Sequence, residues 1–356
     1  MLITEKPVGP TSPPRPYSIT DLPPLIVGGA TFNYQYTDNP EAAPIYEILD
    51  TAFNSGLIAV DTSPYYGPSE ILVGKALTEL STKWPRETYF ICTKAGRIAL
   101  NEFDYSASAI RKSVKRSLER LNTEYLDLVY LHDIEFGEID DIMDGLKELK
   151  RLKAEGIVKN IGITGYPVDF LYRVALAAHN NEEIGSLDAI LSYCHGCIQN
   201  TTLFEYYSKF FDECHVKKIM NGSILSMSLL RSGKTHTFHP GSTELKEAVA
   251  AVAKDLSEQG VELAELSTRF ALKSWLFDTS KATQSDKTNL SWNKKTSVVL
   301  GLGNVDELMS AITNFWKVKL NVSNSSEDDA KYVAQVQQQL GSHFNESWES
   351  GIEHDI

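Results

Sequence analysis

The feature that most constrains this chain is a long alternation of short apolar runs with amphipathic segments. Strands buried on both faces read as continuous apolar runs, whereas amphipathic helices place apolar residues three and four positions apart. Eight runs of the first kind lie at Leu25–Ala30, Leu57–Thr62, Tyr89–Lys94, Leu126–His132, Lys159–Thr164, Leu187–Tyr193, Lys218–Met227 and Thr296–Gly303. Helical patterns lie at Glu41–Ser55, Ser69–Ser81, Ser106–Leu121, Ile139–Glu155, Val168–Asn180, Leu203–Cys214, Glu244–Glu258 and Leu263–Trp275. This alternation predicts an α/β fold, a closed parallel (β/α)8 TIM barrel.

A doubly wound open sheet is the alternative arrangement of parallel strands and helices. Such a sheet usually has a glycine-rich GxGxxG turn after its first strand. Here that turn is Gly28-Gly29-Ala30-Thr31, which does not complete the pattern. The closed barrel is therefore the preferred prediction.

Changes in composition predict where the barrel begins and ends. Residues 1–23 are rich in proline and are expected to form an irregular leader. The barrel is expected to span residues 24–317 as a single domain, with a polar surface insertion at about 278–295 between its seventh and eighth strands. Residues 318–356 form a C-terminal extension with a helix predicted at Glu327–Leu340.

Charge and targeting signals exclude several classes of function. Lys and Arg number 34 against 47 Asp and Glu, so the net charge is −13. This field repels a phosphate backbone, and no nucleic-acid partner is expected. We expect no membrane segment, because no apolar run approaches the ~18 residues that a spanning helix needs. The absence of a secretory signal and the presence of only four cysteines predict reduced thiols in a cytoplasmic protein, and the oligomeric state is left open.

Candidate chemistry gathers at the carboxyl ends of the second, third and fourth predicted strands, which is where barrels of this type place their active sites. Asp61, Lys94 and His132 end these strands, and Tyr65 and Tyr66 follow Asp61 in the next loop. An ammonium group favours the ionised form of a neighbouring phenol, and a buried carboxylate can keep that ammonium charged. An imidazole facing the same point can orient a substrate oxygen. Such a set is suited to proton transfer.

Three segments that carry these residues resemble the aldo-keto reductases, a likeness that extends from about Leu25 to Trp316. The segments are Val60-Asp-Thr-Ser-Pro-Tyr-Tyr-Gly67, Ile91-Cys-Thr-Lys94 and Asp127-Leu-Val-Tyr-Leu-His132. The resemblance makes Tyr66 the proton donor or acceptor. It makes Lys94 and Asp61 the residues that tune the phenol, and His132 the residue that orients the substrate.

Further segments are similar to the sugar 1-dehydrogenases of that superfamily. They are Gly162-Ile-Thr-Gly-Tyr-Pro167, Ile190-Leu-Ser-Tyr-Cys194, Phe238-His-Pro240, Leu225-Ser-Met-Ser-Leu-Leu-Arg-Ser232 and Trp348-Glu-Ser-Gly-Ile352. The likeness implies oxidation of the anomeric carbon of a free aldose, D-arabinose foremost, to a lactone for D-erythroascorbate-type synthesis, with NAD as cofactor. The alternatives are a broad NADPH-dependent carbonyl reductase and a cofactor-binding regulatory subunit of the same fold.

The same resemblance implies a set of cofactor contacts at the ends of several strands and in the loops that follow them. Thr164 and Gly165 stand where relatives carry Ser-Asn, and Met227 stands where many stack a tyrosine on the nicotinamide. The full candidate set is Gly29, Thr164, Gly165, Ser192, Ser226, Met227, Ser228, Leu230, Ser232, Gly301, Leu302, Gly303 and Glu307. The run Gly301–Met309 holds no basic side chain but carries Asp306 and Glu307. It predicts a preference for NAD over NADP, because a carboxylate repels the 2'-phosphate of NADP.

Two weaker signals remain. Cys194-His-Gly-Cys197 has the spacing of some zinc and redox sites, but no second close pair of cysteines exists, so a structural role without metal is expected. Four aromatic residues are candidates for lining a sugar face, with an ordinary surface position as the alternative for each; they are Phe32, Tyr34, Tyr105 and Trp348.

Overall fold

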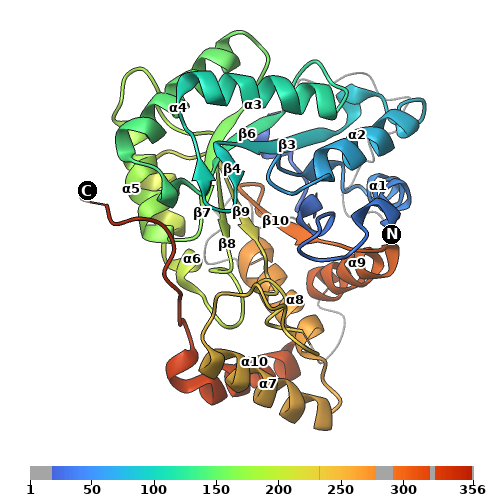
Figure 1. Cartoon of the computed structure of the whole chain (residues 1–356). Coiled ribbons are helices and arrows are strands. Elements are labelled where there is room, and N and C mark those ends of the chain that lie inside the picture. The colour runs from blue at the N-terminus through green and yellow to red at the C-terminus, as the bar shows by residue number, and fades with distance from the viewer. Residues whose placement is uncertain (1–17, 232, 278–291, 321–324, 355–356) are drawn as a thin grey trace.

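Parallel strands close into a barrel in the computed structural model, which describes residues 18–231, 233–277, 292–320 and 325–354 (Figure 1). Within these residues, eight strands pair in the order β1-β10-β9-β8-β7-β6-β3-β2. Their bounds are Leu25–Gly28 (β1), Ala59–Asp61 (β2), Phe90–Ala95 (β3), Leu128–His132 (β6), Ile161–Gly165 (β7), Ala189–Tyr193 (β8), Lys218–Gly222 (β9) and Thr296–Gly301 (β10). All of these pairs are parallel. The predicted α/β TIM barrel is confirmed.

Helices cover the outside of the barrel, and a short hairpin follows the third strand. The helices are α1 (Ile45–Asn54), α2 (Ser69–Leu80), α3 (Ala107–Arg120), α4 (Ile139–Ala154), α5 (Val168–His179), α6 (Thr202–Glu205), α7 (Thr243–Glu258), α8 (Leu263–Leu272), α9 (Val305–Leu320) and α10 (Ser325–Leu340). The hairpin pairs β4 (Arg97–Ala99) with β5 (Glu102–Phe103). This hairpin has no counterpart in the sequence prediction.

Two elements differ from the predicted ones because the backbone turns where the apolar pattern continues. The run Lys218–Met227 was expected to be one strand, but β9 ends at Gly222. Ser223, Ser226 and Met227 have positive φ angles of 52°, 47° and 46°, which no strand accommodates. The helix expected at Leu203–Cys214 is divided into the single turn of α6 and a π-helical turn at Lys209–Glu213.

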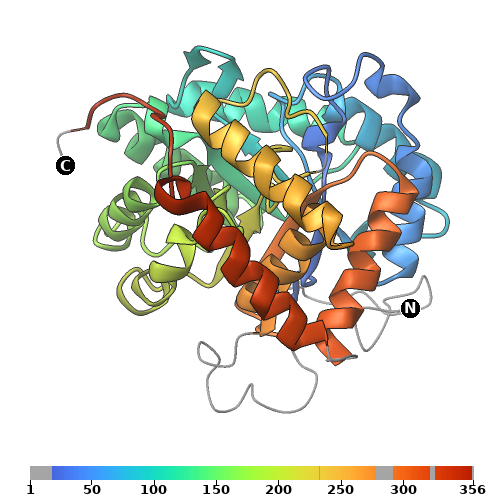
Figure 2. The same ribbon diagram turned by 90° about the horizontal axis from the view of Figure 1, so that it is seen from below.

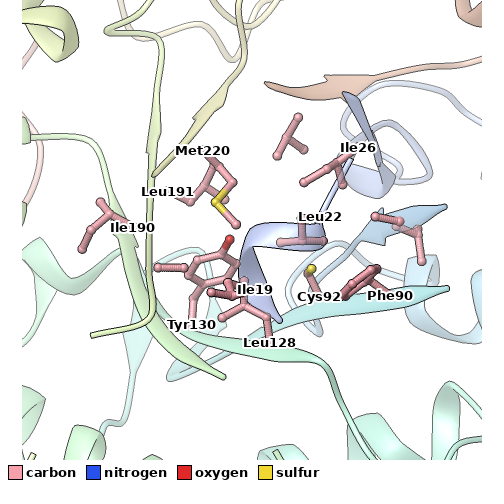
Figure 3. Packing of buried hydrophobic residues seen from close by; sticks show 14 of the residues in the cluster. Ile19, Leu22, Ile26, Phe90, Cys92, Leu128, Tyr130, Ile190, Leu191 and Met220 are labelled. Carbon is pink, nitrogen blue, oxygen red and sulfur yellow. The ribbon is translucent and has the colours of Figure 1, made fainter. Parts of the chain in front are cut away.

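The barrel floor is sealed by residues that the prediction assigned to the irregular leader. Ile19 and Leu22 belong to the main hydrophobic core, and Ile19 lies in a one-turn 3₁₀ helix. Figure 3 shows both side chains among core residues of the strands, with Tyr130 beside them. The fully buried Lys218 donates hydrogen bonds to the carbonyl oxygens of Leu22 (3.1 Å) and Lys294 (2.8 Å), which ties this segment to the floor. Prolines around these two apolar residues hide their role in the sequence.

A second, smaller core joins the C-terminal extension to the barrel. Helix α10 packs against α7 and α8, as the view from below shows (Figure 2). Leu245, Leu256, Leu266 and Leu340 are among the buried residues of this core. After α10 the chain runs back over the barrel towards α5 (Figure 1). Among the described residues, no helix has the length and apolar character needed to cross a membrane.

Candidate active site

Barrel closure brings the four predicted catalytic side chains into one cavity of about 1140 Å³. Asp61 ends β2 and His132 ends β6, while Lys94 lies one residue before the end of β3. Tyr66 lies in the turn that leads into α2. Since β3 pairs with both β2 and β6, these strand ends are neighbours, and the side chains face the same space. The predicted grouping of these residues is present in the structure.

A buried ion pair lies beneath the tyrosine. Lys94 Nζ donates hydrogen bonds to Asp61 Oδ1 (2.5 Å) and to the carbonyl oxygen of Thr62 (2.9 Å). The same nitrogen lies 4.7 Å from the centroid of the Tyr66 ring. Burial lowers the pKa of Lys94, but Asp61 and Tyr66 outweigh this effect, and the net pKa is raised. Lys94 is therefore charged at neutral pH.

Tyr66 is under two opposing influences. Burial raises the pKa of its phenol, Lys94 opposes that rise, and Asp61 and Asp133 add to it. The balance is a raised pKa, although the sequence argument expected the ammonium to dominate. The phenol therefore keeps its proton in this state of the site.

His132 is a neutral imidazole. Burial lowers its pKa well below the usual range, and the charges of Lys94 and Arg97 lower it further. Its ring is perpendicular to that of Tyr66, at a centroid distance of 5.7 Å. Ser63 Oγ lies 3.0 Å from Nδ1, which fixes the ring orientation. A neutral imidazole held in this way can hydrogen-bond an uncharged substrate oxygen beside the phenol.

Sequence reasoning missed a charged pair in the same cavity. Arg97, from β4, forms a salt bridge with Asp133, and its Nη2 donates to the hydroxyl of Tyr65 (3.1 Å). The Arg97 guanidinium lies 3.9 Å from the centroid of the Tyr65 ring. Asp133 directly follows His132 and has a left-handed backbone, with φ 51°. The adjacency of Asp133 to His132 was the only available signal, because nothing in the sequence predicted the hairpin that carries Arg97.

The C-terminal tail supplies another wall of the cavity. Trp348 lines it and stacks on Tyr166, with ring centroids 4.3 Å apart. Gln199 Nε2 donates to the carbonyl oxygens of His343 and Glu346, both at 3.0 Å, and so holds the tail in place. Of the four aromatic candidates, Phe32 and Trp348 line the cavity, whereas Tyr105 is buried outside it and Tyr34 is exposed.

The predicted cofactor contacts divide into two groups. Seven line the cavity: Thr164, Met227, Ser228, Gly301, Leu302, Gly303 and Glu307. Gly29, Gly165, Ser192, Ser226 and Leu230 do not line it, and Ser232 lies outside the described residues. Leu230 is part of the second core, and a Cβ at Gly165 would lie 2.3 Å from Glu135 Oε2. Packing therefore accounts for these two positions.

The loop after β9 lines part of the cavity and has an unusual backbone conformation. Ser226, Met227 and Ser228 follow one another with positive φ angles. Ser223 Oγ accepts a hydrogen bond from Met227 N (2.9 Å), and Ser228 Oγ accepts one from His236 N (3.1 Å). Residues other than glycine rarely adopt positive φ angles, and consecutive residues with such angles are typical of functional loops.

Acidic residues of α8 and α9 also line the cavity. Glu307 is in the first turn of α9, and its Oε2 accepts a hydrogen bond from Gly303 N (2.7 Å). Glu307 N in turn donates to Asn304 Oδ1 (2.9 Å), so the Asn304 side chain caps the helix while the Glu307 carboxylate holds the turn before it. Sequence reasoning missed Glu265 and Thr268 of α8, which also line the cavity; Glu265 Oε2 lies 3.9 Å from Lys317 Nζ in the last turn of α9.

Cys194 and Cys197 are buried free thiols. Cys197 Sγ donates to the carbonyl oxygen of Cys194 (3.2 Å). Burial raises the pKa of the Cys194 thiol to about 12 and that of the Cys197 thiol to about 11. Across the described ranges, no group of three or more His, Cys, Asp or Glu side chains is placed to hold a metal ion.

Comparisons with known proteins agree with this geometry. The chain is 47% identical to D-arabinose 1-dehydrogenase of Saccharomyces cerevisiae, over 96% of this chain and 97% of the relative. It is 33% identical to L-galactose dehydrogenase of Arabidopsis thaliana, over 85% of each.

Solved structures share the fold at low sequence identity. An aldo-keto reductase from Bacillus halodurans in its holo form matches with a TM-score of 0.60 and 19% identity, over 88% of this chain and 92% of its own. A glycerol dehydrogenase from Gluconobacter oxydans matches with a TM-score of 0.59 and 18% identity, over 94% and 96%. The family model "Aldo/keto reductase family" matches residues 24–332. With the barrel closed and the tyrosine, lysine, aspartate and histidine in one cavity, the chain belongs to the aldo/keto reductase family.

Proposed function

We propose that this protein is an NAD-dependent dehydrogenase that oxidises the anomeric carbon of a free aldose to the aldonolactone. D-Arabinose is the expected sugar, because a relative named D-arabinose 1-dehydrogenase is 47% identical over nearly the whole chain. The observation that carries the proposal is the cavity that holds Tyr66 above the buried Lys94–Asp61 pair. The lactone product would serve D-erythroascorbate-type synthesis.

Aldo-keto reductases use a nicotinamide cofactor, and the cavity suits one. Its volume of about 1140 Å³ exceeds the ~300–1,000 Å³ common for small-ligand pockets. Ser228 would face the pyrophosphate, Met227 would lie against the nicotinamide ring, and the backbone of Gly301–Gly303 would face the adenosine ribose. Glu307 would accept hydrogen bonds from the free ribose hydroxyls. When bound, the nicotinamide ring takes up the hydride from the anomeric carbon.

The chain's own residues manage the proton. The Tyr66 oxygen, as phenolate, accepts the proton of the anomeric hydroxyl as the C1–H bond breaks. Lys94 stabilises the phenolate, and Asp61, 2.5 Å away, keeps that lysine charged. His132, neutral and held by Ser63, hydrogen-bonds the same substrate oxygen and orients it towards Tyr66.

Initial rates for a panel of aldoses with NAD and with NADP test this proposal. D-Arabinose, L-galactose, L-fucose and L-xylose are to be compared as substrates. We expect D-arabinose with NAD to give the highest kcat/KM. Turnover of simple carbonyl compounds with NADPH and of no aldose would instead favour a broad carbonyl reductase. Binding of nucleotide, seen by fluorescence, without any turnover would favour a regulatory subunit.

A further inference from the structure

The pair formed by Arg97 and Asp133 lies beside the reacting groups, and the proton transfer does not use it. Both side chains are largely buried and line the active-site cavity. The guanidinium of Arg97 forms its salt bridge with Oδ2 of Asp133. This same oxygen lies 3.5 Å from Nε2 of His132. Among the described residues, the hydrogen bonds and ion pairs of the Asp133 carboxylate engage Oδ2 and leave Oδ1 to the cavity. A carboxylate with a free oxygen therefore flanks the imidazole that faces the substrate.

The placement of Asp133 relative to His132 matches the spacing of a vicinal diol. The substrate oxygen that reacts lies between the Tyr66 hydroxyl and the His132 ring in the proposed function. The neighbouring hydroxyl of a sugar lies about one hydrogen-bond length from that oxygen when the two are gauche. Asp133 Oδ2 is 3.5 Å from Nε2 of His132. When the anomeric oxygen is hydrogen-bonded to His132, the hydroxyl on the next carbon is therefore within reach of Asp133.

We propose that Asp133, braced by Arg97, is a specificity-determining residue that accepts a hydrogen bond from the hydroxyl on the carbon next to the anomeric carbon. This inference rests on the proposed aldose oxidation. A hydroxyl–carboxylate hydrogen bond in a dry cavity is strong, and a substrate that lacks the hydroxyl leaves one oxygen of the carboxylate without a hydrogen bond. The enzyme would thus favour 2-hydroxy aldehydes in their cyclic form over simple aldehydes.

A second Arg–Asp pair at the other end of the same strand provides a matched control. Asp127 directly precedes β6, and Asp133 directly follows it. Asp127 Oδ2 accepts hydrogen bonds from Arg86 Nη2 (2.6 Å) and from Ile91 N (2.8 Å). Neither residue of that pair lines the cavity. A substitution there disturbs a buried ion pair of the same composition without touching the sugar.

The test compares kcat/KM for D-arabinose and for 2-deoxy-D-ribose, which is D-arabinose without its 2-hydroxyl. Wild type, Asp133→Asn and Asp127→Asn are measured with saturating NAD. Asparagine is suitable at position 133 because it tolerates the left-handed backbone found there. We expect the wild type to favour D-arabinose by about 10- to 100-fold. Asp133→Asn should reduce that ratio to within about 3-fold, chiefly by slowing D-arabinose, whereas Asp127→Asn should keep the wild-type ratio.

Each contrary result has its own meaning. Equal kcat/KM for the two sugars in the wild type would overturn the inference while leaving aldose oxidation intact, and this arm needs no variant to fold. A loss in Asp133→Asn that is equal for both sugars would also overturn it, because Asp133 would then act only through His132. Turnover of neither sugar by the wild type would contradict the proposed function itself.

Discussion

In the proposed oxidation Tyr66 must lose its proton, and its surroundings oppose that loss in the state described. Burial raises the pKa of the phenol, and Lys94 offsets only part of the rise. Each pKa unit corresponds to about 1.4 kcal/mol between the two protonation states. Oxidation should therefore accelerate as the pH rises, because the phenolate fraction grows until the pKa of Tyr66 is passed.

Replacing Tyr66 with phenylalanine is expected to leave the fold intact and to remove most turnover. The phenyl ring keeps the packing against His132 but lacks the oxygen that accepts the proton. A general acid or base contributes about 10²- to 10⁴-fold, and kcat should fall by that factor. Thermal unfolding and NAD binding, followed by nucleotide fluorescence, serve as controls. Activity within about 3-fold of wild type would contradict the role assigned to Tyr66.

The cysteine pair gives a second prediction at the residue scale. Protonated, buried thiols are poor nucleophiles and poor metal ligands, and burial raises the pKa values of Cys194 and Cys197 to about 12 and about 11. The double variant Cys194→Ala/Cys197→Ala should keep kcat within about 3-fold and lose about 1–3 kcal/mol of stability from emptied core volume. Metal analysis of the wild type should find no stoichiometric zinc. One zinc per chain, absent from the double variant, would refute the structural role.

That the four candidate catalytic residues lie together was predictable from sequence, but the residues around them were not. Asp61, Lys94 and His132 end consecutive predicted strands, and barrel closure alone brings such ends together. Arg97 reaches the site on a hairpin whose two strands are three and two residues long. Strands that short leave no periodic pattern to detect.

At the scale of elements, the loop after β9 shows that an apolar run in the sequence can extend beyond the end of the strand. Ile224 and Leu225 continue the apolar run of the strand, yet the chain turns at Ser223. The turn is held by side-chain hydrogen bonds, such as that from Met227 N to Ser223 Oγ. An apolar run in the sequence gives no information about such hydrogen bonds, so the predicted strand was too long.

The first turn of α9 carries the prediction about cofactor choice. Glu307 lines the cavity and closely follows the Gly301–Gly303 run that is expected to face the adenosine ribose. A like charge about 4 Å from a 2'-phosphate costs on the order of 4 kcal/mol at an effective dielectric of about 20, before screening. The wild type should therefore prefer NAD over NADP by at least about 100-fold in kcat/KM. Glu307→Arg should narrow or reverse that preference.

Glu307→Gln is the matched control, because its amide oxygen can still accept the hydrogen bond from Gly303 N. It should retain the helix cap and lose only the charge. We expect an intermediate preference, with kcat/KM for NAD reduced less than in Glu307→Arg. Equal kcat/KM for NAD and NADP in the wild type would refute the charge argument.

At the scale of the whole molecule, closure of the barrel followed from eight apolar strands, but the path of the tail did not. The tail is held by bonds between residues far apart in sequence, such as Gln199 with His343 and Glu346, which are 144 and 147 positions apart. The second core likewise joins α7 and α8 to α10 across the chain. Amphipathic periodicity predicts a helix at 327–340 but not the surface that it covers.

Two buried carboxylates should affect the stability of the folded chain differently between pH 5 and pH 9: that of Glu135 titrates in this range and that of Asp188 does not. Glu135 lies beneath the tail, where Ser350 Oγ (3.0 Å) and Tyr166 N (2.9 Å) donate to its Oε1. Burial and the charge of Asp133 raise the pKa of Glu135 from 4.5 to about 8. Asp188 is also buried, but Lys153, Lys217 and the N–H of Ile161 hold its pKa below 3.8 against the effect of burial. Asp188 is therefore ionised throughout the pH range in which Glu135 titrates.

The last prediction is that Glu135→Gln gains stability relative to wild type as the pH rises from about 5 to about 9. The unfolded chain releases the Glu135 proton near its ordinary pKa of 4.5, whereas the folded chain holds it to about pH 8. Between these values wild-type folding loses stability with increasing pH, and a neutral glutamine avoids this loss. Thermal midpoints should be close at pH 5 and should diverge in favour of Glu135→Gln by pH 9. Asp188→Asn should instead be less stable than wild type by a constant amount across this range, and parallel curves for Glu135→Gln and wild type would show that Glu135 does not titrate here.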